Sequence, residues 1–254
     1  MSPAARRRYL FTVTTGRSGT EWLARVLALF ADVDAEHEPK PRFSSCFRAV
    51  VAAPAIAREF WEREKLPRLA RVKKPVYAET SHLFCKGFAE CLPELGLAPD
   101  LLHLRRDPRA VARSLWSLES IPGRSLRGVR YYLSPWDPNH LPVDRARAER
   151  WNDYQLCYWY CLEIDARARH LERVLAPHGT RVFRVELAEL QTPQGIAALG
   201  ERLALGPLST LGKLRLATLA ARPVNEKRHQ KRDETLPEGE LDAWEAEVRD
   251  HSRT

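Results

Sequence analysis

A short run of glycine, arginine and hydroxyl residues near the N-terminus has the composition of an anion-binding loop. It follows an apolar segment, precedes apolar residues at helical spacing, and reads Gly16-Arg17-Ser18-Gly19-Thr20. Backbone amides at a helix N-terminus point outward unpaired, and the helix dipole adds positive potential there. The two glycines let this backbone approach an anion closely, Arg17 adds a charged fork, and the hydroxyls of Ser18 and Thr20 add donors. The sequence predicts a phosphate-binding loop, with an ordinary glycine-containing strand–helix turn as the alternative.

This loop differs from that of the common nucleoside triphosphatases. Their loop ends on a lysine followed by serine or threonine, and Thr20 stands where that lysine belongs. A kinase-like phosphotransferase is therefore disfavoured, although it remains the alternative enzyme. A catalytically idle nucleotide-binding domain is the alternative from a different class.

A second basic and hydroxyl cluster follows a later apolar run. Arg106 stands at the end of the run 101–105, and Asp107-Pro108 then supplies an N-cap and a first-turn proline for a helix. Ser114 lies two turns into that helix. Both side chains are expected to reach the sheet edge that carries the first loop, where together they would hold a second phosphate.

Two further positions offer a group that can remove a proton from an attacking hydroxyl or amine. The first is Glu38, in the segment Glu36-His37-Glu38, and the second is His82, which closes Glu79-Thr80-Ser81-His82. Solvated loop charges remain the plain alternative for the two glutamates in the first segment. A hydrogen-bonded histidine at a strand end remains the plain alternative for His82.

Taken together, the two anion-binding motifs resemble those of the sulfotransferases that use 3′-phosphoadenosine 5′-phosphosulfate (PAPS). The segments that carry the resemblance are Thr14-Thr15-Gly16-Arg17-Ser18-Gly19-Thr20-Glu21-Trp22 and Leu104-Arg105-Arg106-Asp107-Pro108 with Ser114. The likeness extends over about residues 9 to 205, since Arg184-Val185-Glu186-Leu187 falls where the family has a strand ending in an acidic residue. The resemblance implies a P-loop-like sulfotransferase fold and an enzyme that moves a sulfuryl group from PAPS to an acceptor hydroxyl or amine. The product would be 3′-phosphoadenosine 5′-phosphate (PAP), and the family works without a metal.

The resemblance also implies a role for each matching residue. The loop residues Gly16 to Glu21 would hold the 5′-phosphosulfate, with Arg17 stabilising the bridging oxygen as it leaves. Trp22 would stack on the adenine, and Arg106 with Ser114 would hold the 3′-phosphate. A loop that closes over the nucleotide is expected at Lys227 and Arg228, although the basic, glycine-containing motif of the family's cytosolic branch is missing there.

The resemblance bears on the proton acceptor as well. The acidic segment around Glu38 is similar to the one that supplies the base in trehalose-type and N-deacetylase-type sulfotransferases, whereas His82 falls where the cytosolic branch has its histidine. We therefore expect Glu38 to be the catalytic base, with His82 second and His37 and Glu79 as helpers.

Alternating strand and helix patterns must position these residues. The sequence predicts strands at 9–14, 75–80, 101–105 and 181–186, with helices after Gly19, after Asp107, over 143–176 and over 193–203. Such alternation predicts an α/β fold with three αβα layers around a mainly parallel sheet. We expect a single domain over residues 1–254, with long loops at about 121–142 and 206–237 that are either lids or binding loops. Tyr131, Tyr132 and Trp136 in the first of these could line an acceptor pocket or anchor the loop.

The composition of the chain limits which ligands, compartments and cysteine sites are expected. The chain of 254 residues has 41 Lys+Arg against 33 Asp+Glu, a formal charge of +8, and its arginines are scattered among acids. Such scatter suits one polyanionic ligand better than nucleic acid. No apolar run approaches a membrane span, and the N-terminus lacks the apolar stretch of a secretory signal, so a cytoplasmic protein is expected. Five cysteines do not form a disulfide framework, and Cys157 with Cys161 is expected to lie on a buried helix face rather than in a metal site. The acceptor is expected to be a small molecule, sugar or lipid-like compound, and the oligomeric state is left open.

Overall fold

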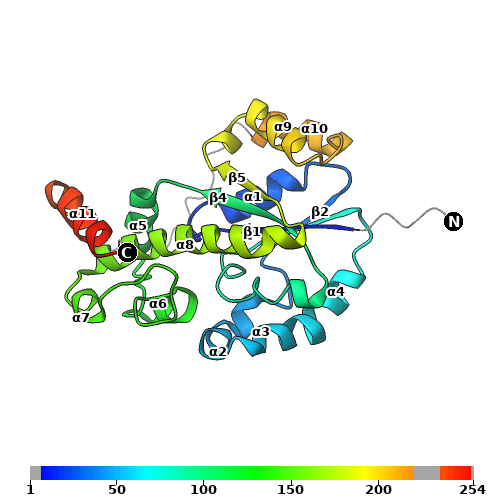
Figure 1. Ribbon diagram of the computed structural model, residues 1–254. Helices are drawn as coiled ribbons and strands as arrows, with labels where there is room; N and C mark the ends of the chain where they lie inside the picture. Colours follow the sequence, from blue (N-terminus) through cyan, green and yellow to red (C-terminus); the bar gives the residue numbers. More distant parts are fainter. Residues whose placement is uncertain (1–6, 220–234, 253–254) are drawn as a thin grey trace. The chain divides into compact units, whose positions relative to one another are not determined.

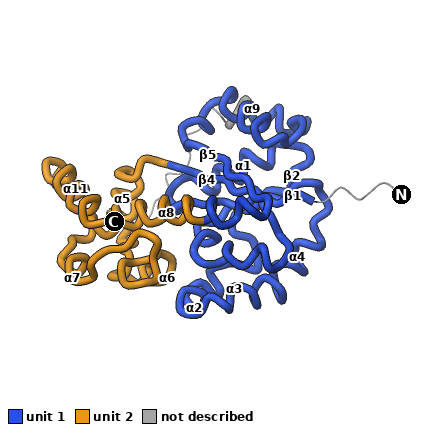
Figure 2. The backbone as a smooth tube through the Cα atoms, viewed as in Figure 1, with its two compact units in different colours: residues 1–105, 171–226 blue, residues 106–170, 227–254 orange. Residues whose placement is uncertain are grey.

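The computed structural model describes residues 7–219 and 235–252 (Figure 1). The chain divides into two compact units, each made of two chain segments (Figure 2). Unit 1 comprises residues 1–105 and 171–226, and unit 2 comprises residues 106–170 and 227–254. The prediction of one sulfotransferase domain over the whole chain stays a prediction.

Unit 1 is built on a five-stranded sheet in which every neighbouring pair is parallel. The strand order is β2-β3-β1-β4-β5. The strands are β1 (Arg8–Val13), β2 (Val33–His37), β3 (Val76–Thr80), β4 (Asp100–Arg105) and β5 (Val182–Glu186). All four predicted strands are present to within one residue at each end. The predicted α/β class with a central parallel sheet is therefore confirmed.

One strand, β2, was not expected from the sequence. Only its first residue, Val33, is fully buried, and the others are polar or half-buried. It lies at the edge of the sheet and pairs with β3 alone, with Glu36 opposite Glu79 and His37 opposite Thr80. Its backbone pairing with β3 holds this strand in place. The side chains of β2 do not alternate between apolar and polar, so the sequence carries no strand pattern here.

Helices cover both faces of this sheet (Figure 1). Alternate residues of β1 show the two faces, since Leu10 belongs to the core beneath α1 whereas Phe11 stacks on Phe84 at 4.7 Å between ring centroids. One face carries α1 (Thr20–Leu27), α9 (Pro193–Arg202) and α10 (Thr210–Leu219). The other carries α2 (Phe47–Ala52), α3 (Ala55–Phe60), a π-helical turn (Trp61–Lys65) and α4 (Leu66–Ala70).

Unit 2 is helical. Its helices are α5 (Pro108–Ser117), α6 (Leu126–Tyr131), α7 (Arg145–Ala148), most of α8 (Asp153–Leu175) and α11 (Leu241–His251). The Asp107 side chain caps α5 by accepting from the amides of Arg109 and Ala110, as predicted. The helical stretch expected over 143–176 is broken into α7 and α8. Asp144 caps α7, and its side chain accepts from two backbone amides.

The two segments expected to be long loops both contain helices. The segment 121–142 contains α6, and Tyr132 packs edge-on against Tyr160 of α8 at 5.2 Å between centroids. That contact gives Tyr132 an anchoring role within unit 2. The segment 206–237 contains α10, and its part from 220 to 234 lies outside the described residues.

None of the helices within residues 7–219 and 235–252 combines the length and the apolar composition needed to cross a bilayer.

Candidate functional site

The loop predicted to bind an anion joins β1 to α1 at the carboxyl edge of the sheet. The connection after β1 leads to β2 on one side, whereas the chain after β4 leads to β5 on the other. The neighbouring strands β1 and β4 therefore diverge at this point, and open parallel sheets bind ligands at such a divergence. Thr14 ties the loop to β4, because its hydroxyl donates to the Leu104 carbonyl at 2.8 Å.

Left-handed residues give the loop its shape. Gly16 and Gly19 have φ angles of 76° and 89°, and Arg17 between them has a φ of 54°. These left-handed residues bend the chain tightly between β1 and α1, and Gly19 is the N-cap of α1, whose first backbone N–H groups are not used within the helix. A Cβ at Gly19 would lie 2.5 Å from Leu187 Cδ1, so a larger residue there would displace the end of the Leu187 side chain. Arginine in this conformation costs roughly 1–3 kcal/mol, the kind of strain that concentrates at functional sites.

The hydroxyl of Ser18 has a structural position. Ser18 is fully buried, and its Oγ lies 2.5 Å from Thr14 Oγ1. The Thr14 hydroxyl donates its single hydrogen to the Leu104 carbonyl, so Ser18 is the donor in the bond between the two hydroxyls. Its hydroxyl therefore braces the loop from inside. The role predicted for this hydroxyl toward an anion stays a prediction.

The first turn of α1 also departs from the expected assignments. Glu21 pairs with Arg25 one turn later at 2.7 Å. Trp22 is 2% exposed, belongs to the core, and donates its indole N–H to the Leu190 carbonyl at 2.9 Å. Its burial gives Trp22 a packing role and leaves adenine stacking without support. Thr20, the first residue of the helix, is also buried.

His82 lies directly against the loop. A Cβ built on Gly16 would be 3.1 Å from His82 Cγ and 3.2 Å from its Nδ1. The imidazole thus occupies the space beside the left-handed Gly16, two residues after the end of β3. Burial is the main reason that the pKa of His82 falls well below its ordinary value, and the nearby Lys86 and His37 lower that pKa further. The ring is therefore neutral at neutral pH.

Glu38 completes the group on the other side of His82. Its Oε1 lies 3.7 Å from His82 Nε2, and its side chain is 33% exposed. Pairing of β2 with β3 brings it there, since the Glu38 amide donates to the Thr80 carbonyl at 3.2 Å. Glu38 is also left-handed, with a φ of 45°. The structure thus brings together the two residues that the sequence offered as competing bases, next to the predicted anion loop.

The two predicted helpers have structural partners instead. Glu79 is buried and receives two hydrogen bonds from Lys65 Nζ, at 2.6 and 2.8 Å. His37 donates from Nδ1 to the Thr80 carbonyl at 2.9 Å, which fixes its ring on β3. Burial and the pair with Lys65 give Glu79 a structural role, and its role as a catalytic helper stays a prediction.

Lys86 is the residue that the sequence interpretation missed. It is 1% exposed, and its Nζ lies 3.1 Å from His82 Nδ1. Lys86 follows His82 by four residues, the spacing of one helical turn, and that spacing was the available signal. No turn was predicted in the segment after β3.

The residues predicted to hold the 3′-phosphate belong to unit 2. Arg106 is exposed and precedes the N-cap of α5, and the half-buried Ser114 lies in the second turn of that helix. Their assignment stays a prediction. Lys227 and Arg228 lie outside the described residues.

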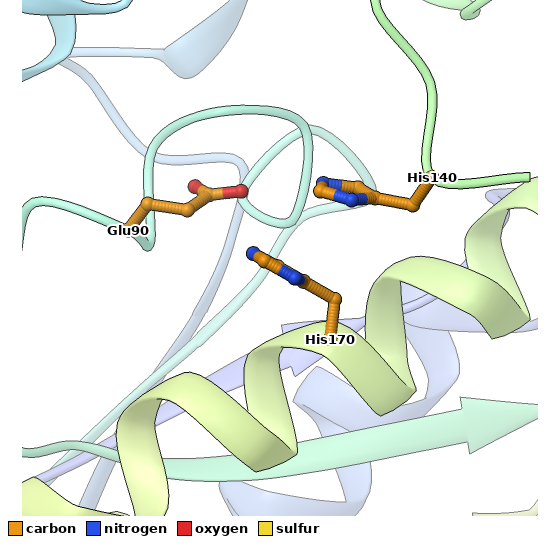
Figure 3. A group of neighbouring side chains, drawn as sticks. All are labelled: Glu90, His140 and His170. Atoms are coloured by element: carbon orange, nitrogen blue, oxygen red, sulfur yellow. The ribbon is translucent and has the colours of Figure 1, made fainter.

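Two groups in unit 2 bear on metal binding. Cys161 donates from Sγ to the Cys157 carbonyl at 3.3 Å, and burial raises the pKa of its thiol well above the ordinary value, so it stays protonated. Both cysteines lie on the expected buried face of α8. His140 and His170 stack with 4.0 Å between centroids (Figure 3). Glu90, which is labelled in the same view, belongs to unit 1, whereas the two histidines belong to unit 2.

No model of a known protein family matches this chain, and no curated protein matches it.

Proposed function

We propose that this protein is a PAPS-dependent sulfotransferase that transfers a sulfuryl group to a hydroxyl or amine of a small-molecule, sugar or lipid-like acceptor. The observation that carries the proposal is the contact between the glycine loop and the Glu38–His82 pair. An anion loop alone is compatible with many nucleotide binders. An anion loop with a carboxylate and an imidazole beside it has the parts required for group transfer to a protonated acceptor.

Each part has a distinct task in this reaction. The backbone N–H groups at the start of α1, together with Arg17, hold the anionic donor group and stabilise charge on the leaving phosphate oxygen. The acceptor oxygen or nitrogen attacks sulfur in line, the bond from sulfur to the phosphate oxygen breaks, and PAP departs. The acceptor's proton passes to the Glu38 carboxylate. In this assignment Arg106 and Ser114 contact the 3′-phosphate, which distinguishes PAP from ADP.

Thermal unfolding with PAP, ADP and ATP at equal concentrations tests nucleotide binding. A ligand at a hundredfold excess over its dissociation constant stabilises the folded state by about 2.7 kcal/mol. We expect PAP to stabilise the wild type more than ADP does. Arg17→Ala should reduce both effects, whereas Arg25→Ala, which removes an exposed arginine of the neighbouring helix, should leave them unchanged. Arg106→Ala should abolish only the difference between PAP and ADP.

The second arm tests transfer itself. Release of PAP from PAPS is followed with panels of alcohols, amines and sugars. Equal stabilisation by PAP and ADP would favour the phosphotransferase alternative. Selective PAP binding without acceptor-dependent PAP release would favour an idle nucleotide-binding domain.

A further inference from the structure

We propose that Lys86 is a positioning residue that holds His82 in the tautomer protonated at Nε2, so that His82 is a hydrogen-bond donor and Glu38 alone accepts the proton. The inference rests on the proposed function for its catalytic meaning. The tautomer itself is a property of the folded chain and can be measured without any substrate.

The contact between Lys86 and His82 sets the direction of the ring. A lysine ammonium has three N–H donors and no acceptor, so the ring nitrogen that faces it must accept. Nζ of Lys86 lies 3.1 Å from Nδ1 of His82, which is hydrogen-bonding distance. A neutral ring that accepts at Nδ1 carries its hydrogen at Nε2.

Burial strengthens the hydrogen bond between Lys86 Nζ and His82 Nδ1, because little water competes for either group. Lys86 is 1% exposed, and its Nζ lies 5.6 Å from the centroid of the Phe47 ring, where the quadrupole of the ring favours a cation. His82 has 13% of its side chain exposed and lies against Gly16, which limits its rotation. Among the described residues, Lys86 and His37 lower the pKa of the ring, and Glu38 Oε1 lies 3.7 Å from its Nε2.

The consequence is a division of labour between the two base candidates. With hydrogen at Nε2, His82 presents a donor toward Glu38 and has no free lone pair on that side. The separation of 3.7 Å exceeds a hydrogen bond, so His82 does not occupy the proton-accepting capacity of the Glu38 carboxylate. This assignment agrees with the ranking expected from the sequence, in which Glu38 came first and His82 second, and it adds a physical reason for that ranking.

Nitrogen-15 NMR of histidine-labelled protein reads the tautomer directly, because protonated and unprotonated ring nitrogens differ widely in chemical shift. The His82 signals are assigned by their loss in His82→Gln. We expect wild type to show a protonated Nε2 and an unprotonated Nδ1 near neutral pH. Lys86→Arg, which keeps a donor, should preserve this pattern. Lys86→Met, which keeps the length but removes the donor, should give a mixture of tautomers and a higher His82 pKa.

Two results would overturn the proposal: hydrogen at Nδ1 in the wild type, or an unchanged tautomer and pKa in Lys86→Met. Unchanged signals of the other histidines establish that the variant is folded. If Lys86→Met does not fold, the wild-type spectrum and Lys86→Arg decide the matter.

Kinetics connect the tautomer to the proposed reaction. Misplacement of a catalytic group by about 1 Å costs roughly a hundredfold in rate. We therefore expect Lys86→Met to lower kcat by about that factor, to leave PAP affinity unchanged, and to be rescued in large part by Lys86→Arg. A chain with the expected tautomer but no transfer activity would refute the proposed function while leaving the tautomer assignment intact. Full activity in Lys86→Met would refute the positioning role.

Discussion

Two lysine-centred groups lie close to the end of β3 in unit 1, and they differ in how completely they are satisfied. Lys65 and Glu79 have side chains that are 0% exposed, and the carboxylate accepts two bonds from the ammonium. The Tyr77 hydroxyl also lies 3.0 Å from Glu79. In the other group, Lys86 is buried behind His82. The Glu38 side chain at the outer end of this group is 33% exposed, and its Oε1 lies 3.7 Å from His82 Nε2.

The difference separates a structural ion pair from a reactive group. Burial is the main reason that the pKa of Glu79 is raised and that of Lys65 is lowered, and each partner opposes the shift of the other. No site for a substrate proton remains there. Glu38 combines partial exposure, a strained backbone and a neighbouring anion loop, so its accepting capacity is available. The contrast predicts that the two glutamates respond differently to neutralisation.

The largest expected effect concerns Glu38. Glu38→Gln should lower kcat by about 10²- to 10⁴-fold, because it removes the general base while leaving shape and PAP binding in place. Initial rates of PAP release with an acceptor measure this. Glu62→Gln, on the exposed surface of the same unit, is the control and should keep full activity. Full activity of Glu38→Gln would show that a group other than Glu38 is the catalytic base.

Lys65→Met should act on stability instead. Removing one partner of a buried pair leaves an uncompensated carboxylate and costs about 3–5 kcal/mol. Denaturant unfolding measures the loss. The double variant Lys65→Met/Glu79→Leu should recover most of it, since neither buried charge then remains. A single variant as stable as wild type would mean that Glu79 is not held as a carboxylate by Lys65.

Gly16→Ala should have a smaller effect that reports the contact between loop and imidazole. Alanine in the left-handed region costs roughly 1–2 kcal/mol. Gly96→Ala is the matched control, because Gly96 has a similar φ of 68° and no atom within 4 Å of an added Cβ. We expect thermal unfolding to show a larger loss for Gly16→Ala than for Gly96→Ala. Equal losses would place His82 away from the loop in solution.

The smallest expected effect is the pH dependence that His82 contributes. Its pKa is lowered in the folded state, so the unfolded chain binds the extra proton as the pH falls below about 6.5. Stability from this group is complete above that pH and is lost at up to about 1.4 kcal/mol per pH unit below it. Denaturant unfolding of wild type and His82→Gln should therefore converge or cross as the medium becomes acidic. A constant difference from pH 7 to pH 5 would contradict a neutral buried ring.

Local sequence patterns were sufficient for much of the fold. The strands β1, β3, β4 and β5, the glycine turn before α1 and the Asp107 cap of α5 were all predicted, because each is encoded by a few consecutive residues. The edge strand β2 was not predicted, since its pairing with β3 is a long-range contact. The helices α6 and α10 lie in segments that were expected to be loops. Each follows a serine, Ser125 or Ser209, whose hydroxyl accepts from the backbone amide three residues later, which is a local helix-start signal.

For the candidate site, the sequence by itself determined which residue types were available: a glycine loop with Arg17, an acidic segment with Glu38, and His82. Only the tertiary structure decided their relations. Parallel pairing of β2 with β3 brought Glu38 to His82, burial took Trp22 and Glu79 into the core, and the turn after β3 placed Lys86 against the imidazole. Residue identity is local information. Distance, burial and hydrogen-bond direction depend on segments far apart in the chain, and those are fixed only when the sheet assembles.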